Sequence, residues 1–132
     1  MRIITPSEAE NAVLAELTGE YDAYSEMTMD ERRFLNCLLL REKPRNVLEL
    51  GVAAGGSSAI ILNAIKDVDG AVLHSVDYLK YYYQDKTLAS GFVVDSYPAL
   101  AEKRRRHAGG LACKFMDGIG DGIDFCLVDT MH

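Results

Sequence analysis

The stretch NVLELGVAAGGSS, residues 46–58, decides the fold. Its first five residues form a short, mostly apolar run that is typical of a buried β-strand. The glycines that follow allow a tight turn, and the apolar residues 59–65 predict a buried helix. A strand that turns directly into a helix through such a loop is the opening unit of a parallel α/β sheet.

Two further helices are predicted ahead of this unit. Ser7 with Glu10, and Thr28 with Glu31, have the spacing of a capping box at a helix N-terminus. Apolar residues recur at helical spacing after both boxes, and Pro44 ends the second helix because the residue before a proline disfavours helical geometry. The sequence therefore predicts a helical segment over residues 1–45.

The remaining strands are predicted from apolar runs after the first helix of the sheet. They lie at residues 71–77, 111–116 and 123–128, with a helix over 97–107 between the first two. This alternation implies a doubly wound, Rossmann-like parallel sheet with N-terminal helices, an α/β fold. In the order usual for such sheets, the four visible strands run 3-2-1-4.

Length and composition limit the function classes. The 132 residues make one domain, divided into a helical segment, 1–45, and a cofactor-binding part, 46–132. A net charge of −6 argues against nucleic-acid binding, and no apolar run is long enough to span a membrane. The basic run 103–106 falls on the predicted helix, where it is expected to face solvent. Three widely spaced cysteines and the lack of a signal sequence indicate a reduced, cytoplasmic protein.

The ligand is expected at the loop after the first strand, because ligands of such sheets bind beyond the carboxyl ends of the strands. Amides at Ser57 and Ser58 open the following helix and suit an anionic group. Asp77 ends the second strand 21 residues after Gly56, a position that suits a carboxylate bound to ribose hydroxyls. The spacing therefore predicts a nucleoside-containing ligand.

The residue types around the loop narrow the ligand further. A P-loop is excluded because no Lys follows the glycines, and a nicotinamide-binding fingerprint fails at Ala53, where it needs glycine. Glu49 would repel a diphosphate but attract an ammonium or sulfonium group. S-adenosylmethionine carries both groups and a ribose. It is the preferred ligand, and a nicotinamide-binding fragment is the weaker alternative.

Residues 47–58 resemble motif I of class I S-adenosylmethionine-dependent methyltransferases, a large enzyme family. They are most similar to the subgroup whose loop reads E-x-G-x-x-x-G-x-S. Residues 91–100 and 123–132 are also similar to bacterial members of that subgroup, which include relatives of macrocin O-methyltransferase and of cephalosporin-cluster enzymes. The resemblance covers residues 46–132.

The resemblance implies a role for each matching residue of the cofactor site. Glu49 would lie near the methionine amino end of the cofactor, Asp77 would bind the ribose, and Asp117, in the turn after the third strand, would approach the adenine. The loop residues that would wrap the cofactor are Gly51, Ala53, Gly55, Gly56 and Ser57.

The resemblance also implies a catalytic pair. Sugar-modifying relatives carry D-x-x-H after the fourth strand, which matches Asp129 and His132 here. By this resemblance Asp129 would help to bind a divalent cation such as Mg²⁺, and His132 would act as the base. The expected reaction is O-methyl transfer to a small-molecule or sugar-like hydroxyl.

The chain departs from the family in length, because the family continues with further strands and a second acidic metal site. The fold is therefore expected to be incomplete relative to the family, with one edge of the fourth strand lacking its usual partner. This leaves an alternative function open: a catalytically silent, truncated Rossmann half-domain that associates through its fourth strand, as in a homo-oligomer.

Overall fold

A computed structural model describes residues 3–130 of the chain. Its N-terminal part contains three helices, α1 (Glu8–Ala15), α2 (Glu20–Tyr24) and α3 (Met29–Glu42). Both predicted capping boxes are confirmed, since Ser7 caps α1 together with Glu10, and Thr28 caps α3 together with Glu31. The helix α3 ends directly before Pro44, as predicted.

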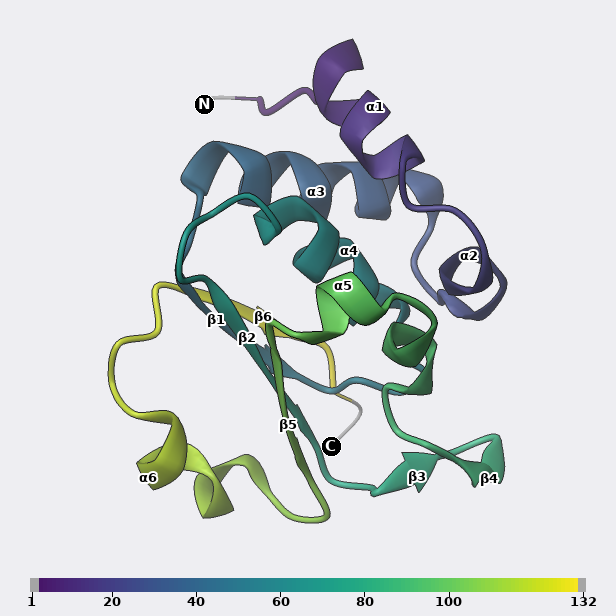
Figure 1. Cartoon of the computed structure of the whole chain (residues 1–132), viewed down its shortest axis with the longest axis vertical. Helices are drawn as coiled ribbons and strands as arrows, with labels where there is room; N and C mark the ends of the chain where they lie inside the picture. The colour runs from purple at the N-terminus through teal and green to yellow at the C-terminus, as the bar shows by residue number, and fades with distance from the viewer. Residues whose placement is uncertain (1–2, 131–132) are drawn as a thin grey trace.

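Four parallel strands form the central sheet (Figure 1). Their order is β5-β2-β1-β6, which confirms the predicted α/β fold class and the order 3-2-1-4. The strands are β1 (Asn46–Leu50), β2 (Val72–Asp77), β5 (Arg104–Ala108) and β6 (Phe125–Val128). The helix α4 (Gly56–Ile65) follows β1, as the apolar run after the glycines predicts.

Short elements connect the second half of the sheet. A hairpin of β3 (Tyr81–Tyr82) and β4 (Asp85–Ala89) follows β2, and then come the 3-10 helix η1 (Phe92–Ser96) and α5 (Pro98–Ala101). Between β5 and β6 lie η2 (Ala112–Lys114) and α6 (Met116–Ile119).

Two sequence predictions are wrong in this half. The helix expected over 97–107 is replaced by the short α5 and by β5, so the basic run 103–106 lies largely on an edge strand. Here the guanidinium of Arg104 donates to the carbonyl of Gly91 (2.9 Å), and that of Arg106 donates to the carbonyl of Ser90 (3.0 Å). These contacts and the pairing with β2 favour the extended backbone. The strand expected over 111–116 is also wrong, because η2 and the start of α6 occupy it.

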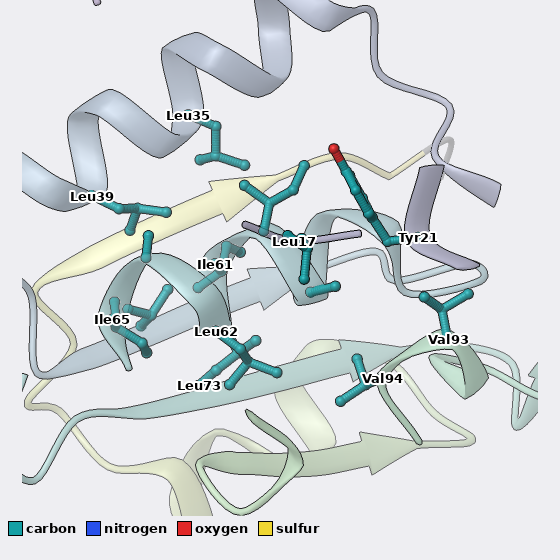
Figure 2. Packing of buried hydrophobic residues seen from close by; sticks show 14 of the residues in the cluster. Leu17, Tyr21, Leu35, Leu39, Ile61, Leu62, Ile65, Leu73, Val93 and Val94 are labelled. Carbon is teal, nitrogen blue, oxygen red and sulfur yellow. The ribbon is translucent and has the colours of Figure 1, made fainter. Parts of the chain in front are cut away.

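The core lies between the sheet and the helices α1, α3 and α4 (Figure 2). Leu39 of α3, Ile61 and Ile65 of α4, and Leu73 of β2 have no exposed surface. The helices α1 to α5 gather on one side of the sheet, whereas α6 lies apart from them on the other side (Figure 1). Within residues 3–130, no helix is both long and apolar enough to cross a membrane.

Candidate functional site

The glycine loop joins β1 to α4 at the carboxyl edge of the sheet. Gly51 has a φ of +95°, and a Cβ there would lie 2.1 Å from the carbonyl oxygen of Asp129. Gly55 has a φ of +102°, and its Cβ would lie 2.9 Å from the Cα of Gly91. Only glycine fits both positions, because the loop passes tightly between the end of β6 and the start of η1.

Asp77, at the end of β2, supports this loop. Its Oδ2 accepts hydrogen bonds from the amides of Val52 and Ala53, both 3.0 Å long. Its Oδ1 accepts a hydrogen bond from the amide of Leu79, also 3.0 Å. Asp77, which is predicted to bind the ribose, therefore has a structural role as well, since it fixes the first half of the loop.

The opposite side of the loop is held by the segment after β4. The amide of Gly91 donates to the carbonyl of Ala53 (2.8 Å), and the amide of Val93 donates to that of Ala54 (3.0 Å). Ala53 has a φ of +53°, a left-handed conformation that is uncommon for a residue with a side chain. The loop is thus hydrogen-bonded from both sides in one conformation, as a preorganised binding site requires.

Glu49 is the penultimate residue of β1. It lies beneath the loop and has no exposed surface. The hydroxyls of Ser57 and Ser58 donate to its two carboxylate oxygens, each at 2.5 Å, and that of Ser75 donates to one of them at 3.2 Å. Burial raises the pKa of Glu49 to about 7, against the opposing effect of the three hydroxyls. This carboxyl group therefore changes charge near neutral pH.

The first turn of α4 completes the site. The amides of Gly56, Ser57 and Ser58 have no acceptor within the helix, as at any helix start. Ser25, in the connection between α2 and α3, packs tightly here, because a Cβ on Gly56 would lie 2.9 Å from its Cα. The hydroxyl oxygen of Ser25 is buried and has no hydrogen-bond partner among the described residues. Sequence reasoning missed Ser25, since no motif marks a residue that arrives there only by folding.

An aromatic cluster adjoins the same segment. The ring of Tyr24 makes edge-on contacts with Tyr82 of β3, at 6.2 Å between centroids, and with Phe92 of η1, at 4.9 Å. The hydroxyl of Tyr83 donates to the carboxylate of Glu26. The hairpin β3–β4 is therefore fixed to the connection between α2 and α3, next to the first turn of α4.

Most of the predicted site residues lie together at this edge of the sheet. They are Glu49, Gly51, Ala53, Gly55, Gly56, Ser57, Asp77 and Asp129. Asp117 does not lie in the turn after the third strand, because that strand is β5, which ends at Ala108, and Asp117 is exposed on α6. His132 lies outside the described residues.

The donor set does not fit a Mg²⁺ site within the described residues. Asp129 is exposed just after β6, where its amide donates to the carbonyl of Leu50 (2.9 Å). Within residues 3–130, no three His, Cys, Asp or Glu side chains come together to hold a metal ion. A hard cation needs several such oxygen ligands, so the metal role of Asp129 stays a prediction.

Comparison with known proteins supports the fold. No protein-family profile matches the sequence, and no curated protein matches it significantly. The structure is similar to that of cofactor-bound Rv0187 from MTB, with a TM-score of 0.58 and 20% identity over 92% of this chain and 53% of that one. It is also similar to the SAH-bound Podospora anserina methyltransferase PaMTH1, with a TM-score of 0.58 and 14% identity over 98% of this chain and 62% of that one.

These two likenesses establish a Rossmann-like α/β fold that is shared with a methyltransferase. The chain spans between about half and about three fifths of the length of those two chains, with 53% of one and 62% of the other covered.

Proposed function

We propose that the protein binds S-adenosylmethionine at the glycine loop and transfers its methyl group to a hydroxyl of a small, sugar-like molecule. The observation that carries this proposal is the carboxyl group of Glu49, buried directly beneath the loop and connected to it by the hydroxyl of Ser57. The fold shared with an SAH-bound methyltransferase supports the same ligand class.

Charge selects the ligand. Glu49 itself has no exposed surface, so its charge acts on a ligand through Ser57, which is only partly buried. The Ser57 hydroxyl donates a hydrogen bond to Glu49. The lone pairs of the Ser57 oxygen therefore remain able to accept a hydrogen bond from an ammonium group. A buried negative charge also attracts a sulfonium and repels a diphosphate. The arrangement therefore favours S-adenosylmethionine over a dinucleotide.

Asp77 and the first turn of α4 would hold the rest of the ligand. Each carboxylate oxygen can accept more than one hydrogen bond, so Asp77 can bind ribose hydroxyls while it continues to support the loop. The free amides of α4 and the unpartnered hydroxyl of Ser25 suit the carboxylate of the amino-acid portion. The adenine contact of Asp117 stays a prediction from the resemblance, and Asp117 lies on α6 rather than in the turn after the third strand.

The chain's residues would assist methyl transfer by positioning and by accepting a proton. When bound, S-adenosylmethionine would supply a methyl group on a positively charged sulfonium, with the neutral thioether of S-adenosylhomocysteine as the leaving group. The acceptor must lose its proton as the new bond forms, and we assign the acceptance of that proton to His132, because histidine is the residue type that most often acts as a general base. The site contributes mainly orientation of the two reactants.

Isothermal titration of the 132-residue chain with S-adenosylhomocysteine tests the proposal. We expect binding by the wild type, and we expect Glu49→Gln to weaken S-adenosylmethionine by about tenfold more than S-adenosylhomocysteine, because only the former carries the sulfonium charge. Glu16→Gln is the matched control, since Glu16 pairs with Lys66 away from the site (2.7 Å).

Three results bear on the interpretation. Absence of heat with S-adenosylhomocysteine at high micromolar concentration, in a sample that is folded by circular dichroism, contradicts the proposal. Equal weakening of both ligands by Glu49→Gln contradicts the charge argument. Binding of NADH in a fluorescence titration would favour the nicotinamide alternative, and we expect none.

A further inference from the structure

Two histidines meet on the face of the sheet that is opposite to α4. On β2, the hydroxyl of Ser75 donates to Glu49 on the side of α4, so the preceding residue, His74, points to the opposite face. His107 of β5 is in register with Val76 and therefore shares that face. The Nδ1 of His74 and the Nε2 of His107 lie 3.0 Å apart, and the two rings are stacked, with centroids 5.3 Å apart. This histidine pair joins the edge strand β5 to β2.

The histidine pair keeps its hydrogen bond only while at least one imidazole is neutral. The bond needs an N–H group on one ring and a lone pair on the other, whereas two protonated rings have only donors. Protonation of both rings would also set two positive charges against each other across the 3.0 Å contact. The pair therefore has a bonded state and a separated state, and protons decide between them.

Burial and positive charge favour the bonded state at neutral pH. Burial lowers the pKa of His74, and the neighbouring His107 and Arg105 lower it further. Burial also lowers the pKa of His107. The folded chain therefore binds fewer protons here than the unfolded chain does, and the stability due to the pair is lost as the pH falls below the ordinary histidine value of 6.5.

The other charged groups at this face supply no counter-charge for a doubly protonated pair. The cations are Arg105 of β5, in register with His74, Lys114 of η2, and Lys80, which packs on the residue after β5. Asp117 of α6 and Cys113 of η2 are exposed, and neither forms a hydrogen bond or ion pair with a ring of the pair. Acidification therefore favours separation of the two rings.

The segment that connects β5 to β6, residues 109–124, meets the sheet at the histidine pair. Phe115, at the end of η2, lies against His107, with 5.6 Å between the ring centroids. The far end of the segment is fixed by Asp124, which accepts from two amides at the start of β1. Between these points α6 lies apart from the other helices (Figure 1), and no residue of the segment is buried. Few contacts other than that of Phe115 with His107 thus hold this segment in place.

We propose that the histidine pair is a pH-dependent switch, which holds residues 109–123 on the sheet while one imidazole is neutral and releases them when both are protonated. Short helices are unstable without packing, so η2 and α6 would unfold on release while the rest of the fold persists. This inference does not depend on the proposed function, because neither histidine belongs to the glycine loop.

Hydrogen exchange of the 132-residue chain, followed by mass spectrometry at pH 7.5 and 5.0, tests the inference. The rates are corrected for the intrinsic effect of pH on exchange. We expect the hydrogen-bonded amides of η2 and α6, among them those of Lys114, Phe115 and Ile119, to lose protection by about tenfold at the lower pH. The amides of α4 should keep their protection.

Two variants separate the switch from a merely structural role of the pair. In His74→Gln the amide can still hydrogen-bond to His107 but cannot take up a proton, so residues 109–123 should be protected equally at both pH values. Phe115→Ala removes the contact with His107, so the same residues should exchange rapidly at both pH values.

Glu49→Gln is the matched control, because Glu49 also titrates near neutral pH but lies on the side of α4. This variant should keep the loss of protection at low pH. Wild-type protection of residues 109–123 that does not change with pH overturns the inference. So does a loss that persists in His74→Gln, a loss that extends equally to α4, or wild-type protection in Phe115→Ala.

Discussion

The carboxyl ends of β1 and β2 carry two acidic residues in adjacent strands, and their surroundings differ sharply. Asp77 accepts hydrogen bonds from three backbone amides at the rim of the site, and two of these amides belong to the glycine loop. Glu49 accepts only serine hydroxyls and has no exposed surface. Asp77 therefore fixes the backbone of the loop, and Glu49 provides a buried charge.

This difference separates the two tasks of a binding loop. Backbone amides that lose their acceptor destabilise a fold, so the carboxylate of Asp77 has to be in place before any ligand arrives. The hydroxyls around Glu49 can rotate, so the charge of Glu49 can vary with pH without dismantling the loop. Shape therefore depends mainly on Asp77 and charge selectivity on Glu49.

The largest effect is expected for Asp77→Ala. The substitution leaves the amides of Val52, Ala53 and Leu79 without their acceptor, and we expect a loss of about 3 to 4 kcal/mol in the free energy of unfolding. Urea unfolding followed by circular dichroism measures it. The loop would lose its fixed conformation, so S-adenosylhomocysteine binding should be lost as well.

Asp124→Ala is the control for this experiment. Asp124 also accepts two backbone amides, those of Arg45 (3.0 Å) and Asn46 (2.9 Å), but at the opposite edge of the sheet. It should lower stability and retain ligand binding at temperatures where the variant is folded. If Asp77→Ala were as stable as the wild type, the supporting role of Asp77 would be wrong.

The elements that could be predicted from the sequence are those whose signals are local. The capping box of Thr28, the apolar run of β1 and the positions of the loop glycines all depend on neighbouring residues, and the structure confirms them. Glu49 and Asp77 could be placed at one edge because adjacent parallel strands end there.

The elements that could not be predicted depend on distant partners. β5 reads RRRHA, and no apolar alternation marks it as a strand. Its first and third arginines, Arg104 and Arg106, donate to the carbonyls of residues 91 and 90. The contact of His107 with Phe115 likewise joins β5 to a segment that looks like a strand in the sequence. In the site, Ser25 and Ser75 come to the loop and to Glu49 only through folding.

A smaller effect, opposite in sign, is expected for Glu49→Gln. Its pKa is about 7 in the folded chain against an ordinary value of 4.5, so between these pH values the folded state retains a proton that the unfolded state has lost. Stability due to this group therefore falls as the pH rises from 4.5 to about 7, and stays low above it. Glutamine removes this cost, and we expect the variant to gain up to about 3 kcal/mol at pH 8 and little at pH 4.5.

Thermal unfolding at pH 4.5, 6 and 8 measures this dependence, with Glu16→Gln again as the control for loss of an exposed carboxylate. A stability difference between Glu49→Gln and the wild type that does not change with pH would mean that Glu49 keeps one charge state throughout. Glu49 and Asp77 would then differ only in their hydrogen-bond partners and not in how their charge depends on pH.

The smallest effect concerns Ala53, whose amide donates to Asp77 and whose carbonyl accepts from Gly91. These two bonds hold it at a φ of +53°, which costs an alanine about 1 kcal/mol and a glycine nothing. Ala53→Gly removes this strain but adds freedom to the unfolded chain, so we expect a net gain of a few tenths of a kcal/mol in the free energy of unfolding.

Ala54→Gly is the control. Ala54 is buried and lies outside the left-handed region, so glycine there should lower the free energy of unfolding by about 0.5 to 1 kcal/mol. Urea unfolding distinguishes the two signs. A loss at both positions would mean that the bonds to Asp77 and Gly91 do not confine Ala53, and that the loop relaxes when no ligand is bound.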